Sequence, residues 1–307
     1  MLRKLALLLI FSLLLTGCTA APQSSGSYTF TDDTGVSLSL EPRPQRVAVL
    51  FSSFAEVWTL AGGEVSITVG ESVERGFADK DAVLVDSGAG KSINTELLLR
   101  SEPDLVLCSA DIAAQVEAAA LLNGAGIPAA CFRVDTFEDY LRMLKICTDL
   151  TGDSAAYEKN GAAVAARIET MLAGLDGEPQ NKQILFIRAG SGASSTKAKT
   201  AAENFVCAML KELGTENIAE AAPVLLDGLS MEAILQAEPD FIFISTMGDA
   251  EAAKANMDAV LAQPAWQSLR AVQEGSYVYL PKDLFQFKPN ARWDEAYAYL
   301  IDLIYEN

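Results

Sequence analysis

The chain has 307 residues, half of them hydrophobic, and carries 41 acidic against 23 basic side chains, so its formal net charge is −18. This excess of negative charge argues against nucleic acid as a partner, because a phosphate backbone repels an acidic surface. The sequence contains no histidine, which excludes serine–histidine and cysteine–histidine catalysis in their usual forms and metal sites built on imidazole. The length is sufficient for two domains of ordinary size.

The first residues have the features of a secretory signal. A short basic start precedes an apolar run, residues 5–15, that is too short to span a membrane comfortably. The four residues that end at Cys18 read L-T-G-C and match the lipobox, in which a cysteine after the cleavage site receives a diacylglyceryl group. We therefore predict a signal peptide over 1–17 and a lipidated, small and polar tether over 18–27. Cleavage would leave 21 basic against 41 acidic residues.

Strands alternate with helices along the first half of the chain. The phrase T-D-D-T-G-V predicts a β-hairpin over 28–40, with Asp32 and Asp33 in a solvated turn. Ser52 and Ser53 are expected as caps of the first helix. Apolar runs predict buried strands over 46–51, 66–69, 82–86 and 128–134, and periodic segments predict helices over 54–60, 112–122 and 137–150. Such alternation indicates a parallel sheet layered by helices.

Two copies of one phrase organise the chain. The first copy, N-T-E-L-L-L-R-S-E-P-D-L-V-L, covers 94–107, and the second, S-M-E-A-I-L-Q-A-E-P-D-F-I-F, covers 230–243. In each copy an amphipathic helix is expected to end before the proline, and a buried strand to follow it. Glu96 matches Glu232, 136 positions later, with no gap in the alignment. This unbroken register indicates an internal duplication and hence two similar lobes.

A long helix is predicted between the two halves, over 153–175, because apolar residues recur there at helical spacing. It would span about 35 Å and suits a strut between domains. The second half then repeats the alternation, with strands over 183–187 and 277–280 and helices over 202–213, 252–261 and 290–305. The remaining cysteines fit no zinc or disulfide framework, so buried thiols are expected and a disulfide stays open at Cys108, Cys131, Cys147 and Cys207.

Ligands of parallel α/β sheets bind beyond the carboxyl ends of the strands. Arginine binds carboxylates and catecholates through a planar fork, and aromatic rings pack on flat ligands, so these residue types in the terminal loops predict a large anionic, partly apolar ligand. The ligand-binding candidates are Ser52, Phe54, Arg75, Phe77, Lys91, Arg188, Lys197, Met247, Phe285, Phe287, Lys288 and Arg292. A nucleotide site at the glycine-rich stretch before Ser92 is disfavoured, because Val85 stands where the P-loop pattern needs glycine.

These motifs, in this order, resemble the substrate-binding lipoproteins of ABC importers for iron–siderophore complexes, haem and cobalamin. The resemblance spans nearly the whole mature chain and includes T-D-D-T-G-V, P-Q-R-V-A-V-L-F-S-S-F-A-E, the two copies of the repeat, the long helix and W-Q-S-L-R-A-V-Q-E-G-S-Y-V-Y-L-P. It implies an α/β fold of two Rossmann-like lobes with mainly parallel sheets, joined by a single long α-helix. The lobes would cover 28–152 and 177–307, and the interdomain helix 153–176.

The resemblance also implies a function. The protein would capture an iron complex, first of all a ferric siderophore, between its lobes and deliver it to an ABC permease dimer. It would act as a monomer without an intrinsic cofactor, outside the cytoplasm and anchored to the cell membrane through lipidated Cys18. One exposed glutamate per lobe would dock on the permease, which by motif selects Glu96 and Glu232.

Other ligands and functions stay open. The lack of histidine removes the zinc- and manganese-binding branches of the family. A haem would need a methionine or a tyrosine as its axial ligand, and Met231 and Met247 are the methionine candidates. We place a corrinoid second and haem third after a ferric siderophore. A surface hydrolase is the alternative from a different class, although no acid–base pair of carboxylates stands out. A structural lipoprotein such as an adhesin would not need loops rich in arginine and phenylalanine.

Overall fold

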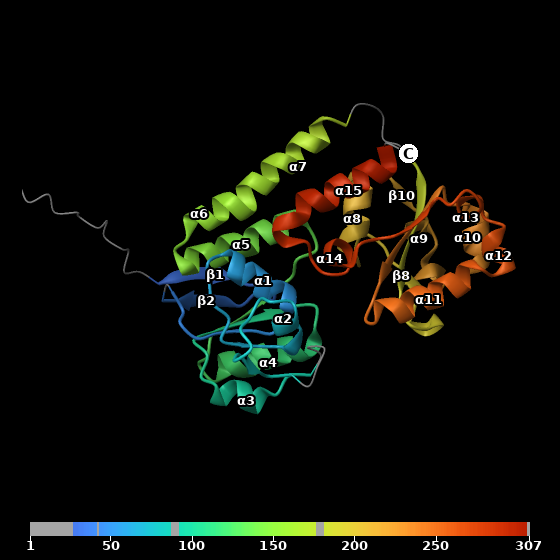
Figure 1. Ribbon diagram of the computed structural model, residues 1–307. Coiled ribbons are helices and arrows are strands. Elements are labelled where there is room, and N and C mark those ends of the chain that lie inside the picture. Colours follow the sequence, from blue (N-terminus) through green and yellow to red (C-terminus); the bar gives the residue numbers. More distant parts are fainter. Residues whose placement is uncertain (1–26, 42, 87–91, 176–180, 306–307) are drawn as a thin grey trace, which may run out of the picture.

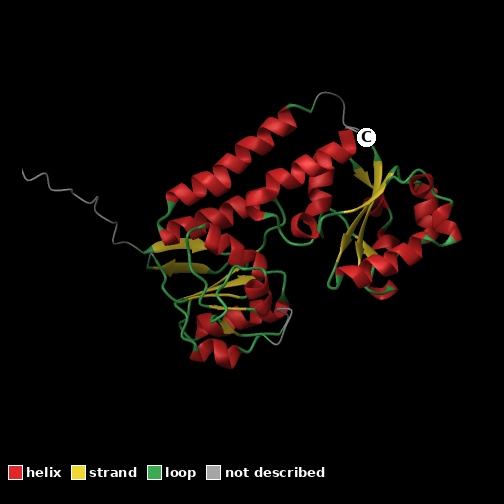
Figure 2. Cartoon of the chain, viewed as in Figure 1, coloured by secondary structure: helices red, strands yellow, loops and turns green. Residues whose placement is uncertain are grey.

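The computed structural model describes residues 27–41, 43–86, 92–175 and 181–305. It consists of two α/β lobes, each built on its own sheet, with long helices between them (Figure 1, Figure 2). The five-stranded sheets are mainly parallel, which confirms the predicted fold class. The predicted signal peptide and the lipidated Cys18 lie outside the described residues, and so does Lys91.

The N-terminal lobe carries a five-stranded parallel sheet in the order β5-β4-β3-β6-β7. The strands are β3 (Val47–Val49), β4 (Ile67–Thr68), β5 (Val83–Leu84), β6 (Leu105–Ser109) and β7 (Ala129–Phe132). Every residue of β3, β6 and β7 is buried, as the apolar runs of the sequence predict for strands covered on both faces. The strand order reverses between β3 and β6, so the loops that follow these two strands separate and leave room for a ligand.

Helices flank this sheet at α1 (Ser52–Leu60), α2 (Gly70–Glu74), α3 (Thr95–Arg100), α4 (Ala113–Gly124) and α5 (Phe137–Thr151). Helix α5 begins with a capping box, in which the side chains of Thr136 and Asp139 satisfy each other's backbone N–H groups. Helix α1 begins without any side-chain cap. The predicted capping role of Ser52 and Ser53 is therefore wrong, and the Ser52 hydroxyl instead donates a hydrogen bond to Glu71.

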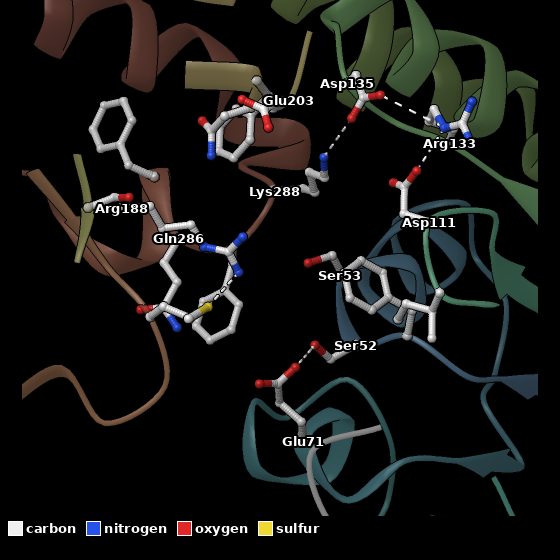
Figure 3. A pocket seen from close by; sticks show the side chains of 18 of the residues that line it. Ser52, Ser53, Glu71, Asp111, Arg133, Asp135, Arg188, Glu203, Gln286 and Lys288 are labelled. Carbon is white, nitrogen blue, oxygen red and sulfur yellow. Dashed lines mark hydrogen bonds and ion pairs between the residues drawn. The ribbon is translucent and has the colours of Figure 1, made fainter. Parts of the chain in front are cut away.

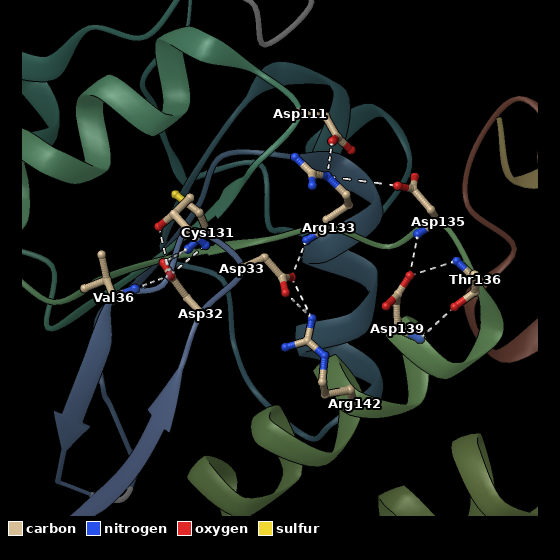
Figure 4. Close-up of polar contacts among 11 residues, drawn as sticks. Asp32, Asp33, Val36, Asp111, Cys131, Arg133, Asp135, Thr136, Asp139 and Arg142 are labelled. Carbon is tan, nitrogen blue, oxygen red and sulfur yellow. Dashed lines mark hydrogen bonds and ion pairs between the residues drawn. The ribbon is translucent and has the colours of Figure 1, made fainter. Parts of the chain in front are cut away.

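The hairpin of β1 (Tyr28–Thr31) and β2 (Ser37–Leu40) is antiparallel, as predicted. Its turn is exposed at residues 34–36, but Asp32 is only 6% exposed. One Asp32 carboxylate oxygen accepts hydrogen bonds from Thr34 and Val36 within the turn, and the other accepts the backbone N–H of Cys131 in β7 at 2.8 Å (Figure 4). The expectation of a solvated turn is corrected at Asp32, which folds the turn and fastens it to the edge of the sheet.

The C-terminal lobe carries a second sheet in the order β10-β8-β11-β12, all parallel, with β9 antiparallel to β8. Its strands are β8 (Gln183–Ala189), β9 (Lys197–Ala198), β10 (Glu216–Asn217), β11 (Phe241–Thr246) and β12 (Tyr277–Tyr279). Its helices are α8 (Phe205–Glu212), α9 (Ile218–Ala221), α10 (Met231–Ala237), α11 (Ala250–Leu261), α12 (Pro264–Gln267), α13 (Arg270–Gln273), α14 (Lys282–Phe285) and α15 (Trp293–Tyr305). The two-residue strands and shortest helices carry no periodic signal, so the sequence pattern misses them.

The repeated phrase has the same structure in both lobes. The first copy forms α3 and β6, and the second forms α10 and β11. After each helix, the glutamate immediately before proline lies in the left-handed region, with φ of 46° at Glu102 and 45° at Glu238. The aspartate after the proline accepts backbone N–H groups at the start of the first strand of its sheet, Asp104 from Arg46 and Asp240 from Gln183. The Glu-Pro-Asp triplet therefore turns the chain from helix to strand and sets the strand's place in the sheet.

The linking helix runs through α6 (Ser154–Tyr157), a π turn (Glu158–Ala162) and α7 (Ala163–Ala173). The π turn brings Gly161 against α5, where an added Cβ would come within 3.1 Å of Leu144. Helix α15 lies beside α7 and is tied to it by an ion pair between Arg167 and Asp294 (Figure 1). The link is therefore a packed layer of helices and not an isolated rod.

The lobes share part of their hydrophobic core. Trp293, at the start of α15, is fully buried and makes edge contacts with Phe137 of α5 and Phe205 of α8. Asn290, just before it, is also fully buried and donates to the backbone of Ser53 in α1 at 2.9 Å. One apolar cluster therefore contains residues from both lobes, while each sheet keeps a second cluster of its own on its other face.

The cysteines confirm the expected buried thiols. Cys108, Cys131, Cys147 and Cys207 are all buried and free of disulfide bonds. Cys108 and Cys131 are register partners on β6 and β7. Burial raises the pKa of the Cys147 thiol, so it stays protonated at neutral pH.

Candidate functional site

A cavity of about 760 Å³ lies between the lobes. The N-terminal lobe lines it with the segments that follow β3, β6 and β7, and with Glu71 of α2. The C-terminal lobe lines it with the ends of β8 and β11, with the segment 202–205, and with residues 285–288, which begin at the last residue of α14 (Figure 3). The carboxyl ends of both sheets therefore face one space, which is where the topology of parallel sheets places a ligand.

Buried hydrogen bonds fix the wall formed by the N-terminal lobe. The Gln115 side chain is fully buried, donates to the carbonyl of Leu50 and accepts the N–H of Ser109, each at 2.7 Å. It thereby ties the end of β3 to the end of β6, beside the backbone hydrogen bond that the Leu50 N–H donates to Leu107. Ser52, the first residue of α1, donates a hydrogen bond from its hydroxyl to Glu71 of α2 (Figure 3).

Arg75 lies behind this wall and connects the two lobes. Its guanidinium pairs with Glu56 at 3.3 Å and stacks over the ring of Phe287, from the other lobe, at 3.9 Å. It also donates to Ser52 and Ser53 at 3.0 and 3.3 Å. Burial lowers the pKa of Arg75 and raises the pKa of Glu56, since each group gives up water when it enters the protein. Arg75 is thus a structural cation that supports Ser52.

A chain of ion pairs crosses the cavity from one lobe to the other. Arg133 contacts Asp111 at 2.7 Å and Asp135 at 4.0 Å, and Asp135 in turn contacts Lys288 at 3.4 Å (Figure 3, Figure 4). The hairpin supports this chain, because Asp33 accepts the backbone N–H of Arg133 at 2.6 Å. Burial lowers the pKa of Lys288, partly offset by the nearby carboxylates.

The wall formed by the C-terminal lobe combines one cation with apolar surface. Arg188, near the end of β8, reaches into the cavity, and its guanidinium contacts the sulfur of Met247 at 2.7 Å. Phe205 and Phe287 add aromatic surface to the lining of the cavity. Desolvation lowers the pKa of Arg188, but no described carboxylate pairs with it.

The structure brings only some of the predicted ligand-binding residues to the cavity. Those that line it are Ser52, Arg188, Met247, Phe285, Phe287 and Lys288. Others lie elsewhere: Phe54 is buried in the core, Arg75 is committed to Glu56, Phe77 lines a separate depression, Lys197 does not reach the cavity, and Arg292 pairs with Asp283 and Glu295. Whether the six lining residues bind a ligand stays a prediction.

Several lining residues were not selected from the sequence. Arg133 falls inside the strand predicted over 128–134. The observed strand β7 ends at Phe132, so Arg133 belongs to the loop that lines the cavity. Glu71 lies between the strands predicted over 66–69 and 82–86, where no helix is predicted, and it belongs to α2. Glu203 lies in the helix predicted over 202–213, and Gln286 follows the strand predicted over 277–280.

The two matched glutamates of the repeat are exposed on separate lobes. Glu96 and Glu232 each stand in the first turn of their helices, α3 and α10. No described helix is long and apolar enough to span a bilayer. Within the described ranges, the acidic and cysteine side chains form no group of three suited to a metal ion.

Comparisons with known proteins agree with this geometry. A family model described as "Periplasmic binding protein" matches residues 47–284. The structure is similar to that of the periplasmic heme-binding protein RhuT from Roseiflexus sp. RS-1 in apo form (TM-score 0.69, 20% identity, 86% of this chain and 98% of that one). It is also similar to Staphylococcus aureus SirA complexed with staphyloferrin B (0.66, 18%, 91% and 97%) and to the periplasmic catecholate-siderophore binding protein VctP from Vibrio cholerae (0.70, 15%, 88% and 97%).

At these identities the similarity to solved structures establishes the fold. A search of curated protein sequences gave no match. The family model covers both lobes and the helix between them, and it ends in α14.

Proposed function

The chain belongs to the periplasmic binding protein family, and from this premise we propose that it captures a ferric siderophore between its lobes and delivers it to an ABC permease. Proteins of this family bind substrates for transport outside the cytoplasm and are not enzymes. The observation that carries the proposal is the cavity of about 760 Å³ at the carboxyl ends of both sheets. That volume lies within the range of small-molecule sites, about 300–1,000 Å³.

The lining chemistry supports an iron chelate. Arg188 presents a guanidinium without a described carboxylate partner, and guanidinium groups bind the anionic oxygens of carboxylates, catecholates and hydroxamates. Phe205 and Phe287 offer aromatic surface for the organic shell of such a complex. Two of the similar structures are described as a staphyloferrin B complex and a catecholate-siderophore binding protein.

Corrinoid and haem are the alternatives from the same transport class. Met247 lines the cavity with its thioether, whereas Met231 lies in α10 and does not reach it. Haem bound here would therefore take Met247 as its axial ligand. A surface hydrolase finds no support, since the family consists of binding proteins.

Fluorescence titration of the purified protein tests this function. Trp293 contacts Phe205 at a ring distance of 5.5 Å, and Phe205 lines the cavity, so a bound ligand should alter tryptophan emission. Saturable binding of a ferric siderophore is expected. Haem would instead give a shifted Soret band that Met247→Leu abolishes. No response to ferric siderophores, haem or cobalamin would overturn the assignment.

We also propose that the matched helices α3 and α10 dock on the permease. Glu96 and Glu232 stand exposed in their first turns. Three residues further on, also at matched positions, Leu99 and Leu235 are 37% and 40% exposed. A glutamate beside an exposed leucine thus occurs once in each lobe. This pattern suits a partner with two equivalent binding surfaces, in each of which a cation contacts the glutamate and an apolar side chain contacts the leucine.

The remaining proposals concern location and boundaries. We propose that cleavage after residue 17 and lipidation of Cys18 anchor the protein to the cell membrane, and that it acts there as a monomer. We keep 28–152 and 177–307 as the binding lobes and 153–176 as the segment between them, with no intrinsic cofactor.

A further inference from the structure

The charges of the cavity are mixed, and they are not those of a simple anion site. Among the described lining residues there are four carboxylates, Glu71, Asp111, Asp135 and Glu203, and three cations, Arg133, Arg188 and Lys288. The lining is therefore negative by one charge. A highly charged anion would meet more repulsion than attraction there, which differs from the anionic ligand that the sequence predicts.

Most of these charges neutralise one another. Arg133 and Lys288 are occupied by Asp111 and Asp135 in the chain of ion pairs across the cavity. Glu203 pairs with Lys199, outside the cavity, at 3.3 Å. Each of these five lining groups already has an oppositely charged partner in the protein, so together with those partners they offer a ligand little net charge.

Two lining charges form no ion pair among the described residues. Arg188 contacts the neutral Met247 sulfur, and Glu71 accepts the hydroxyl of Ser52. Arg75 interacts electrostatically with Glu71 but is paired with Glu56, so these three groups together keep one net negative charge. Arg188 belongs to the C-terminal lobe and Glu71 to the N-terminal lobe, and Figure 3 shows their side chains converging on the same space from these different walls.

We propose, resting on the proposed function, that the ligand is a dipolar ferric chelate. Its anionic metal-binding oxygens contact Arg188, and a cationic group, an ammonium, contacts Glu71. The class that fits is a ferric trihydroxamate with a free amine, whose iron core is neutral and whose tail is positive. A ferric tris-catecholate of charge −3 is disfavoured, because the described lining carries one more carboxylate than cation.

Three chelates separate the contributions of charge and shape. The first is a ferric trihydroxamate with a terminal ammonium, the second is the same chelate with its amine acetylated, and the third is a ferric tris-catecholate. The acetylated form keeps the iron core and removes only the positive charge. Affinities are measured on the purified full-length protein by fluorescence quenching at low and high salt.

The variants then assign each end of the ligand. In the wild-type protein the ammonium form should bind at least tenfold more tightly than the acetylated form. Glu71→Gln should reduce that ratio to within about twofold, while Glu74→Gln, an exposed change on the same helix, should leave it intact. Arg188→Met should weaken both hydroxamates by the same factor. Thermal melts of each variant confirm that it is folded.

The outcomes are distinct. Tightest binding of the tris-catecholate, or an ammonium-to-acetyl ratio that Glu71→Gln leaves unchanged, overturns the dipolar ligand but keeps the siderophore-binding function. Failure of all three chelates to bind the folded wild-type protein overturns the proposed function and this inference with it.

Discussion

Replacement of Trp293 by alanine tests whether the two lobes fold as one unit. The Trp293 side chain is fully buried and lies between Phe137 of one lobe and Phe205 of the other, at ring distances of 6.0 and 5.5 Å. Loss of a buried tryptophan costs about 3–5 kcal/mol in protein cores. Because large rings on both sides limit collapse of the space, we expect about 4 kcal/mol, a large share of a total stability of about 5–15 kcal/mol.

Trp293→Phe is the matched control. The indole N–H of Trp293 has no hydrogen-bond partner among the described residues, although it is buried. An orphan buried donor costs about 1–3 kcal/mol, so phenylalanine removes a penalty while it keeps most of the aromatic contact. The two effects oppose each other, and Trp293→Phe should change stability by about 1 kcal/mol or less.

Urea unfolding followed by tryptophan fluorescence provides the measurement. The chain has three tryptophans, so the Trp293 variants keep one buried reporter in each lobe, Trp58 and Trp266. Variants that retain only Trp58 or only Trp266 as the reporter should show the same urea midpoint of unfolding. The shared-core argument is refuted if Trp293→Ala loses less than about 1 kcal/mol, if Trp293→Phe loses as much as alanine, or if the two reporters give separate transitions.

Three further predictions concern the hairpin, a buried acid and the docking helices. Asp32→Ala should lower stability by about 2–4 kcal/mol in denaturant unfolding, because it leaves the Cys131 and Val36 N–H groups unpaired, whereas Thr34→Val should cost about 1 kcal/mol. Burial raises the pKa of Glu56 above its ordinary 4.5, so the folded state binds a proton more tightly than the unfolded state. Stability should therefore fall as pH rises through the window above 4.5, and Glu56→Gln should gain on the wild type across it. Glu96→Ala with Glu232→Ala should abolish uptake in cells and leave ligand affinity unchanged.

Each of these has a clear contrary outcome. Equal losses from Asp32→Ala and Thr34→Val would show that the anchor to β7 contributes nothing. Parallel pH profiles for Glu56→Gln and wild type would show that Glu56 does not titrate in that window. Normal uptake by the double glutamate variant would remove α3 and α10 from the docking surface.

The sequence predicts the main strands and helices well, because apolar runs and the residues that end them are local signals. The strands at 47–49, 105–109, 183–189 and 241–246 lie where buried runs predict them, and α5 covers the predicted 137–150. The sequence also predicts that the helix in each copy of the repeat ends before its proline. It does not predict the left-handed glutamates, since residues other than glycine rarely adopt positive φ and the strain is held by tertiary contacts.

The candidate site was less predictable, because partners that meet only in the fold decide the role of each charge. Arg75 and Arg188 look alike in sequence, yet packing gives one a glutamate 19 positions earlier and leaves the other facing the cavity. Asp32 reads as a turn residue, and its bond to Cys131 spans 99 positions. Ser52 was placed correctly at the end of β3, but with the wrong partner, since α2 was not anticipated.

The direction of the docking helices has a consequence for the route of the ligand. Helices α3 and α10 each lead into a parallel strand, so they run back along the sheet, and their first turns lie towards its carboxyl edge. The cavity opens at that same edge in both lobes. A permease that grips Glu96 and Glu232 would therefore sit over the mouth of the cavity. The ligand would then pass directly from the cavity into the translocation pathway of the permease, without release into the solvent.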